Sequence, residues 1–326
     1  MIFYLLLLIL LINFSNCTNN LIYSITSNNL PSEGQIINII NPINNDILFN
    51  KTIVLGCVIN GIASIDESEM TATVLCDYRD LIMINLNNGE FKVIGSVYSL
   101  LPTFASKMQQ FIYSDNMIYL PVSTKNIDNL SLFSYNFNSN TFFVNLLSTK
   151  DYNYTVDGTS IGGFDYNINK MYILYSSDRN NSNSNLISFS VDDISNTLTT
   201  YESIENLNTW LVQLLFTNNQ GDLYALYGNP ETLSFEVCLF KLQSPLQNNS
   251  CSYVFSIPIS QVNVSFSYLH AFLNEEKQQF TIVLLGENNS IQFNTYFISN
   301  FTIVNQYNIN NIWGNSNIEQ TTYFYS

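Results

Sequence analysis

The sequence predicts an all-β protein in which six sheets, each of four antiparallel strands, close into a ring. Three observations predict this fold. Runs of alternating apolar and polar residues fill the chain, paired runs return about every fifty residues, and the two chain ends resemble separated parts of one further repeat. Period-two runs separated by Asn, Gly, Asp and Ser are typical of strands joined by turns.

The first half of each repeat is a predicted hairpin. An apolar or aromatic strand leads through a polar turn into a second strand that carries Tyr or another β-forming residue. Clear copies occupy residues 109–122, 162–175 and 214–227, and looser copies occupy 271–284 and 58–75.

A second predicted hairpin follows every copy of the first. Each runs through six to eight alternating residues, a polar turn and a further alternating run, so four strands make one repeat. These hairpins occupy residues 81–95, 130–147, 186–204, 235–257 and 291–309.

The chain ends supply the sixth repeat. The sequence of residues 19–26 matches that of a second strand, and residues 36–53 provide a third and a fourth strand. Residues 321–326 resemble a first strand that lacks a partner. Pairing of the last strand with the first would close the ring. One four-stranded sheet cannot bury both faces, whereas sheets packed radially bury them against their neighbours.

The repeats resemble secreted six-bladed β-propellers in general. The resemblance spans the predicted mature chain and is carried by weak motifs such as Gly221-Asp222-Leu223-Tyr224. Repeated Trp-Asp ends, a paired-Gly kelch motif and Tyr-Trp-Thr-Asp copies are not found, so no named repeat family is assigned. A seven-bladed ring and two stacked sandwiches are the alternatives.

Residues 1–17 are predicted to be a signal peptide. The apolar run from Ile2 to Ile12 precedes Ser15 and Cys17, which are small enough for signal peptidase. No Lys or Arg precedes the run, and it is shorter than the roughly 20 apolar residues that a membrane-spanning helix needs. We therefore expect a secreted, extracellular protein with one domain, residues 18–326, and no membrane span.

Four cysteines remain once Cys17 is removed, an even number that fits an oxidising compartment. We expect Cys57 to pair with Cys76, and Cys238 with Cys251, because each pair flanks one predicted hairpin. Four buried free thiols are the alternative.

Glycosylation is expected for an exported chain of this composition. The chain has 49 asparagines, so Asn-x-Ser/Thr triplets arise about as often as chance predicts and the motif does not select among them. The acceptors in the mature region are Asn50, Asn129, Asn153, Asn180, Asn248, Asn263, Asn288 and Asn300.

Charge and motifs exclude several functional classes. Ten Lys and Arg against 25 Asp and Glu give a net charge of −15, which disfavours a nucleic-acid partner because such partners need clustered basic residues. The sequence has no phosphate loop, dinucleotide fingerprint or Cys-x-x-Cys motif. No cofactor is expected, with calcium as the one candidate.

Catalytic candidates are few. His270 is the single histidine and therefore the only base available for a Ser-His-Asp arrangement, although a half-buried sheet histidine is the plainer interpretation. Asp165-x-Asn167-x-Asn169 matches the opening of a calcium loop but lacks the central Gly and terminal Glu, which favours an ordinary hairpin turn.

The main hypothesis is a non-catalytic recognition protein that binds a glycan or an extracellular protein through the loops between blades. Aromatic rings in those loops can stack on sugar faces or anchor a partner, and filling gaps between blades is their other role. The ligand-binding candidates are Phe104, Tyr154, Trp210, Trp313 and His270, with Tyr152 and Phe266 in equivalent loops.

The alternative hypothesis is a calcium-dependent hydrolase that resembles six-bladed lactonases, with its site in the central channel. Its visible oxygen ligands are Asn60, Asp165 and Gln213, which supply little negative charge for calcium. A scaffold or storage role is a third hypothesis.

Overall fold

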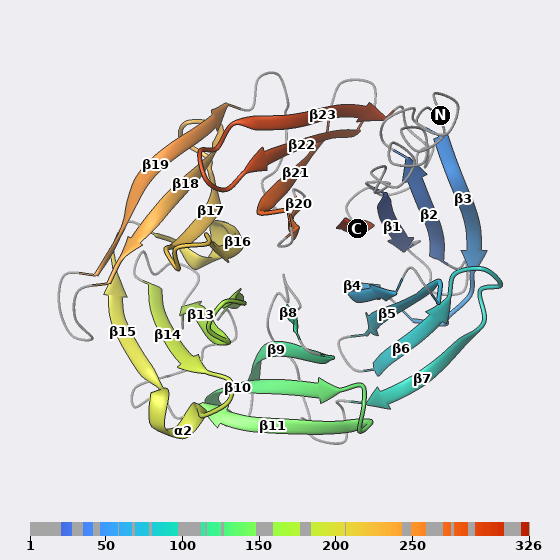
Figure 1. Cartoon of the computed structure of the whole chain (residues 1–326), viewed down its shortest axis with the longest axis horizontal. Coiled ribbons are helices and arrows are strands. Elements are labelled where there is room, and N and C mark those ends of the chain that lie inside the picture. The colour runs from blue at the N-terminus through green and yellow to red at the C-terminus, as the bar shows by residue number, and fades with distance from the viewer. Residues whose placement is uncertain are drawn as a thin grey trace, which may run out of the picture.

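The computed structural model shows a ring of antiparallel sheets around a central axis (Figure 1). The predicted signal peptide lies outside the residues that the structure describes. The described residues are 21–27, 35–41, 46–57, 59–66, 69–77, 80–96, 112–114, 116–124, 127–147, 159–176, 184–205, 207–242, 249–258, 270–274, 277–285, 291–309 and 321–325.

Strand pairing defines six four-stranded sheets, here called blades 1 to 6. Blade 1 contains β24 (Thr321–Tyr325), β1 (Ile22–Ser27), β2 (Gln35–Asn41) and β3 (Asp46–Ile53). Blade 2 contains β4 (Ile59–Asp66), β5 (Thr71–Cys76), β6 (Asp80–Asn85) and β7 (Phe91–Ser96). Blade 3 contains β8 (Ile112–Ser114), β9 (Met117–Thr124), β10 (Ile127–Asn136) and β11 (Thr141–Leu147).

The other three blades follow the same order from the innermost strand outward. Blade 4 contains β12 (Thr159–Asp165), β13 (Lys170–Ser176), β14 (Ser184–Ser190) and β15 (Thr199–Ile204), with the short helix α2 (Ile194–Thr197) before its last strand. Blade 5 contains β16 (Val212–Thr217), β17 (Leu223–Asn229), β18 (Ser234–Lys241) and β19 (Ser250–Pro258), and the 3-10 turn η2 (Thr209–Leu211) precedes it. Blade 6 contains β20 (His270–Asn274), β21 (Gln279–Leu285), β22 (Ile291–Phe297) and β23 (Ile303–Ile309).

The innermost strands close the ring. Contacts join β4 to β8, β8 to β12, β12 to β16, β16 to β20, β20 to β24, and β24 back to β4. The last strand pairs antiparallel with the first, with Ser24 opposite Tyr323 and Ile22 opposite Tyr325. The predicted ring of four-stranded antiparallel sheets, and its closure by the two chain ends, are therefore confirmed.

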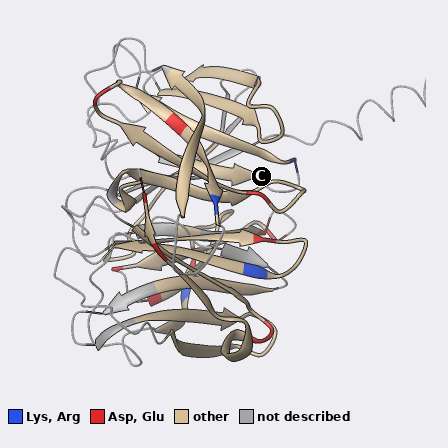
Figure 2. Cartoon of the chain, turned by 90° about the vertical axis from the view of Figure 1, so that its left-hand side faces the viewer, with Lys and Arg blue, Asp and Glu red and all other residues tan. Residues whose placement is uncertain are grey.

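The ring has two distinct faces, because successive strands of a blade run in opposite directions. Turns from first to second strand, and from third to fourth, lie on one face, which we call the turn face. Turns from second to third strand, and the crossings between blades, lie on the other, which we call the crossing face. Figure 2 views the ring from its edge and shows how few charged residues the described blades carry.

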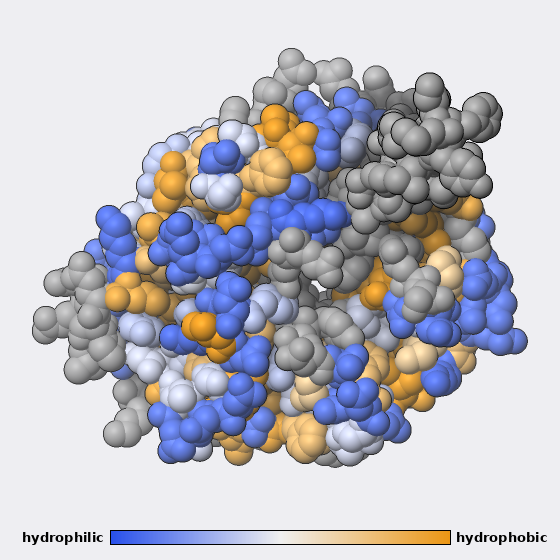
Figure 3. Space-filling model, in the orientation of Figure 1, coloured by the Kyte–Doolittle hydropathy of each residue, from blue (hydrophilic) through white to orange (hydrophobic). Residues whose placement is uncertain are grey.

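Apolar side chains are buried between neighbouring blades. Five clusters of buried residues are found among the described residues, and each joins two adjacent blades; Phe216 and Phe280, for example, join blades 5 and 6. One face of the ring, seen in Figure 3, is mostly hydrophilic or mixed where it is described, with hydrophobic residues in separate spots. Inner strands are buried on both faces, as β16 is at all of its residues, whereas the outer strand β11 alternates between exposed and half-buried residues from Thr141 to Asn145.

The many asparagines have a structural role in the turns. A side-chain amide oxygen accepts hydrogen bonds from backbone N–H groups two to four residues later, and these bonds stabilise a tight turn. The described asparagines that do this include Asn85, Asn136, Asn218, Asn229 and Asn300.

Both predicted disulfides are confirmed. Cys57 is bonded to Cys76, with Cα atoms 5.7 Å apart, and Cys238 is bonded to Cys251, with Cα atoms 5.4 Å apart. The second bond links neighbouring strands of blade 5, as expected for a pair that flanks one hairpin.

Two predicted glycosylation acceptors have described side chains. Asn50 is exposed on β3, and Asn300 is exposed in the turn between β22 and β23. Asn129 lies in β10 with its side chain outside the description, and Asn153, Asn180, Asn248, Asn263 and Asn288 lie outside the described residues. Their modification stays a prediction. No helix in the described part of the chain is long and apolar enough to cross a membrane.

A buried carboxylate stabilises the turn between β17 and β18. Glu236 is only 8% exposed, and its oxygens accept hydrogen bonds from the Tyr227 hydroxyl at 2.6 Å, Asn229 Nδ2 at 2.9 Å, Thr232 Oγ1 at 3.0 Å and Ser234 Oγ at 3.4 Å. Burial alone would raise the pKa of Glu236, but these four donors together lower it below its ordinary value of 4.5. The carboxylate therefore stays charged in the folded protein.

Replacing this carboxylate is expected to change stability in a pH-dependent way. Glu236→Gln should lower the free energy of unfolding at pH 7 by about 2 kcal/mol, because charge-assisted hydrogen bonds are lost. A depressed folded pKa stabilises the fold fully above the unfolded value, and that stabilisation is lost as the pH falls through the folded value. Urea unfolding from pH 7 downward should show this acid-dependent loss in the wild type and not in Glu236→Gln.

The exposed neighbour Glu231 provides the matched control for this measurement. Glu231→Gln should leave stability within about 0.5 kcal/mol of the wild type, as surface substitutions usually do. Equal stability losses in the two variants would contradict the role given to the buried carboxylate.

Candidate functional site

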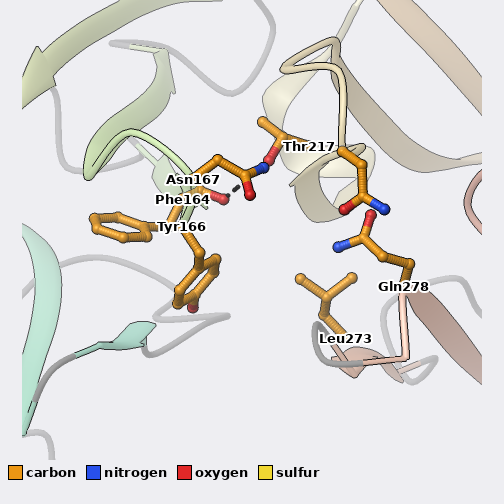
Figure 4. A pocket seen from close by; sticks show the side chains of 7 residues that line it. Phe164, Tyr166, Asn167, Thr217, Leu273 and Gln278 are labelled. Carbon is orange, nitrogen blue, oxygen red and sulfur yellow. Dashed lines mark hydrogen bonds between the residues drawn. The ribbon is translucent and has the colours of Figure 1, made fainter.

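A pocket of about 250 Å³ lies on the turn face of the ring, beside the central axis (Figure 4). It is formed where the innermost strands of blades 4, 5 and 6 end and turn back. The lining residues are Phe164, Tyr166, Asn167, Thr217, Asn219, Leu273 and Gln278.

The turn between β12 and β13 positions one wall of the pocket. Asp165 Oδ1 accepts a hydrogen bond from the Asn167 backbone N–H at 3.0 Å, which stabilises the turn directly beneath Tyr166. Thr217 Oγ1 donates to the Phe164 carbonyl at 3.3 Å and ties blade 5 to this wall (Figure 4).

The close approach of these two blades depends on a glycine. A Cβ built on Gly163 would stand 2.6 Å from Leu215 Cβ and 3.0 Å from the Leu215 carbonyl oxygen, closer than real contacts allow. Gly163 therefore lets β12 and β16 approach each other closely at the hub.

Aromatic rings build the inner part of the same wall. The Phe164 ring stacks on Tyr119 with centroids 5.8 Å apart, and Tyr166 meets Phe164 edge-on at 4.7 Å. Phe164 is 3% exposed and so is held in place by its neighbours, whereas Tyr166 is half-buried. The pocket thus has one rigid ring and one accessible ring.

The opposite wall comes from blade 6. Leu273 lies near the end of β20, and Gln278 follows in the turn to β21, which Asn274 stabilises by accepting from the Lys277 N–H at 3.0 Å. The Gln278 carbonyl accepts the Ile298 N–H at 2.9 Å, so the backbone of this wall is fixed to the neighbouring turn. Figure 4 shows Leu273 and Gln278 across the pocket from Phe164, Tyr166 and Asn167.

The seven lining residues carry no ionisable carboxylate, amine or imidazole. Asp165 is 1% exposed and does not line the pocket. Burial, and then the charge of Asp165, raise the pKa of the nearby Tyr172 to about 12, so this phenol stays neutral at physiological pH. The pocket offers rings, amides and a hydroxyl, which suit hydrogen bonding and stacking rather than proton transfer.

The sequence Asp165-x-Asn167-x-Asn169 forms an ordinary hairpin turn, as favoured above. Asp165 accepts from the Asn167 backbone, and Asn169 has a φ of 49°, a left-handed value that asparagine tolerates. In the described ranges, no group of three or more His, Cys, Asp or Glu side chains lies close enough to hold a metal ion.

The described oxygen ligands considered for a channel calcium, Asp165 and Gln213, lie at different heights of the channel, and calcium binding stays a prediction to be tested. Thr217 is bonded to β12 beside Asp165, and Gln213 lies four residues earlier on the same strand. At about 3.3 Å per residue, Gln213 and Asp165 are about 13 Å apart along the channel. Two ligands of one calcium ion lie within roughly 5 Å of each other. The side chain of Asn60, on β4, is outside the description.

The predicted ligand-binding aromatics remain untested. Phe104, Tyr154 and Trp313 lie outside the described residues, as do Tyr152 and Phe266. Trp210 lies in η2 and His270 opens β20, and the side chains of both are outside the description. Of these positions the structure describes only η2 and the start of β20, which lie on the crossing face, opposite the pocket.

The pocket residues were not predicted from the sequence, although the turn that carries Phe164 and Tyr166 was. A signal was present: the turns after three consecutive innermost strands bring Tyr166, Asn219 and Gln278 to one face. The parallel course of innermost strands in a ring is enough to group these turns.

No protein-family model matches the chain. It is 26% identical over 286 residues to an uncharacterized protein of Dictyostelium discoideum, and the match covers 84% of this chain and 77% of that protein.

Solved structures share the architecture. One is a putative 6-phosphogluconolactonase from Bacteroides uniformis, with a TM-score of 0.50 and 10% identity over 89% of this chain and 83% of that one. Another is a protein from Lactobacillus plantarum, with a TM-score of 0.51 and 9% identity over 88% of this chain and 82% of that one. The chain has a β-propeller fold. At such identities the likeness is one of fold.

Proposed function

We propose that this propeller is a secreted, non-catalytic recognition protein that binds a neutral carbohydrate in the hub pocket. The observation that carries the proposal is the lining of that pocket: an accessible tyrosine ring beside a fixed phenylalanine ring, together with neutral amide and hydroxyl side chains. Those are Asn167, Thr217, Asn219 and Gln278.

Such a lining matches the chemistry of a sugar. The C–H face of a sugar ring stacks on an aromatic face, and amide groups both donate to and accept from ring hydroxyls. A neutral ligand needs no charged partner, and burying a charge would cost solvation energy. The volume of about 250 Å³ is just below the usual range of roughly 300 to 1,000 Å³ for small-molecule sites, which favours one or two sugar rings.

Secretion is supported by two features. The first 17 residues have the pattern of a signal peptide, and the chain forms two disulfides, Cys57–Cys76 and Cys238–Cys251. Disulfides persist in oxidising compartments. An extracellular protein meets the glycans of cell surfaces and matrices, which agrees with a neutral-sugar site.

A glycan array with the purified secreted protein tests the proposal. Tyr166→Ala should weaken binding of the best glycan about tenfold, the equivalent of about 1.4 kcal/mol, because a stacking surface is lost. Tyr253→Ala is the matched control, since Tyr253 is 60% exposed on β19 and away from the pocket. Equal affinity of wild type and Tyr166→Ala would reject this pocket as the binding site.

Two further variants test the tryptophans predicted from the sequence to bind a ligand, on the same array. Trp210→Ala and Trp313→Ala should leave glycan affinity unchanged if the hub pocket is the site. Loss of binding in either tryptophan variant, with Tyr166→Ala unaffected, would move the site from the hub pocket to the segments between blades.

A hydrolase function is favoured only by the likeness to the Bacteroides uniformis protein, which is a likeness of fold. We expect neither calcium binding nor turnover of a sugar lactone by the purified protein. Calcium-dependent turnover that is lost in Asp165→Asn would replace the recognition proposal with a catalytic one.

A further inference from the structure

The turn between β17 and β18 presents an unusual leucine on the crossing face of blade 5. Leu233 is 60% exposed, and its φ of +49° lies in the left-handed region. The three residues before it, Pro230 to Thr232, are also exposed. The turn therefore projects from the ring with an apolar side chain at its end.

Leucine is unfavourable at position 233 for two reasons, its backbone conformation and its exposure to solvent. The left-handed backbone region places Cβ against the following carbonyl oxygen, so glycine and asparagine are preferred there and branched side chains are disfavoured. An exposed leucine also leaves apolar surface in water. Neither the backbone nor the solvation of this position favours leucine.

The same chain uses the preferred residues at comparable turns. Left-handed positions elsewhere in the described chain include Asn116, Asn140 and Asn169, together with Gly89 and Gly221. Asp77, Ser203 and Gln278 are left-handed as well, and their side chains are polar. Asparagine and glycine were thus available solutions to this backbone geometry.

Two other left-handed turn residues are large and apolar, but both are compensated by packing. Met70 packs against the core cluster of blades 1 and 2. Phe301 packs against the cluster of blades 5 and 6, where its ring stacks on Phe255 at 5.5 Å. Among the described residues Leu233 belongs to no core cluster. The fold gives it no such compensation.

The turn is rigid, so Leu233 is held outward. Asn229 Oδ1 accepts from the backbone N–H groups of Glu231 at 3.0 Å and Thr232 at 3.3 Å. The buried carboxylate of Glu236 binds side chains on both sides of the turn, as described above. A preorganised side chain loses little conformational freedom on binding, which favours affinity.

We propose that Leu233 is a docking residue for a partner protein, which receives it in an apolar pocket bordered by a cationic side chain. A site where the sequence departs from local preference without structural compensation is where function is expected. The cationic border follows from charge: Glu231 is exposed two residues away, and the whole chain carries −15. The partner is a protein because a lone rigid leucine fits a shaped pocket.

This docking surface is independent of the carbohydrate pocket. The second-to-third-strand turn lies on the crossing face, and the hub pocket opens on the turn face. One molecule can therefore hold a glycan on one side and a protein on the other. Failure of glycan binding would leave the docking proposal intact, and the reverse also holds.

The first test needs no partner. Leu233→Gly should raise the melting temperature by about 2 °C, because backbone strain is removed and no packing is lost. Leu233→Ala keeps the left-handed strain and should leave the melting temperature unchanged. A lower melting temperature in Leu233→Gly would show that the leucine serves the fold and would overturn the proposal.

The second test identifies and measures the partner. A photoreactive benzoylphenylalanine replaces Leu233 in the full chain, and the protein is irradiated with extracellular proteins of its own organism. The same residue at position 48 is the control, since Leu48 is 53% exposed on the edge strand β3. A protein crosslinked only from position 233 is then prepared in pure form for affinity measurements.

The affinity of the purified partner is then measured for the wild type and for three variants, and these values test the docking proposal. Leu233→Gly should weaken binding at least tenfold, Glu231→Lys should weaken it as well, and Leu48→Ser should have no effect. Equal binding by wild type and Leu233→Gly, or the failure of position 233 to crosslink any protein that position 48 does not, would overturn the proposal.

Discussion

Removal of the last strand is expected to unfold the protein. A chain that ends at residue 320 lacks β24, which pairs with β1 over five residue pairs and also contacts β4 and β20. About five hydrogen bonds are lost, each worth roughly 1 kcal/mol, together with the packing of an innermost strand. The total approaches the 5 to 15 kcal/mol that stabilises a typical domain. Urea unfolding should show no cooperative transition.

A circular permutant separates ring closure from the loss of residues. Tyr325 lies directly opposite Ile22, so a short Gly-rich turn can join the two ends as a hairpin. New ends can be placed between Asp192 and Asp193, which are exposed ahead of α2. This permutant should fold with wild-type disulfides and cooperative unfolding. A truncated chain as stable as the permutant would show that the closing strand is dispensable.

The architecture was largely predictable because every blade repeats the same pattern of strands and turns. Alternating residues indicate β-strands, and the spacing of turns indicates strand length, so the paired runs predicted four strands per blade. The closing pair was predictable because residues 19–26 and 321–326 each lacked a partner in their own region. The local pattern of strands and turns recurs often enough along the chain to predict a ring of similar sheets.

The disulfides were predictable for a related reason. Cys238 and Cys251 flank one turn, and antiparallel neighbours brought together by a hairpin meet the distance that a disulfide requires. No knowledge of the rest of the fold was needed. Apart from the closing pair, the predictions that succeeded concern residues joined by one hairpin.

The candidate site was not predictable in this way, because its residues come from three blades. Tyr166, Thr217 and Gln278 are more than fifty residues apart in sequence and meet only once the ring is closed. Nothing in the local sequence distinguishes the turn that carries Tyr166 from other Asn-rich turns. Exposed aromatics between blades were easier to notice, which directed attention to the crossing face. Leu233 was also missed, since its significance depends on a backbone angle.

Loss of the disulfide in blade 5 is expected to have the second-largest effect. Cys238 and Cys251 enclose a loop with a sequence separation of 13, and linking them restricts the unfolded chain. By the chain-entropy relation, the double variant Cys238→Ala and Cys251→Ala should be less stable by about 3 kcal/mol. Cys251 also donates its N–H to the Glu205 carbonyl at 3.3 Å, so the bond secures the junction of blades 4 and 5.

Reduction provides the internal control for this prediction. Dithiothreitol should lower the urea midpoint of the wild type most, because both disulfides are reduced. It should lower the midpoint of the double variant less, because only Cys57–Cys76 remains to be reduced. It should not change the midpoint of a variant that lacks all four cysteines. Mass spectrometry after alkylation confirms which thiols are free. If the oxidised double variant and the oxidised wild type unfold at the same urea concentration, the bond between β18 and β19 does not stabilise the fold. The junction of blades 4 and 5 would then depend on its hydrogen bonds and on the apolar cluster that holds both cysteines.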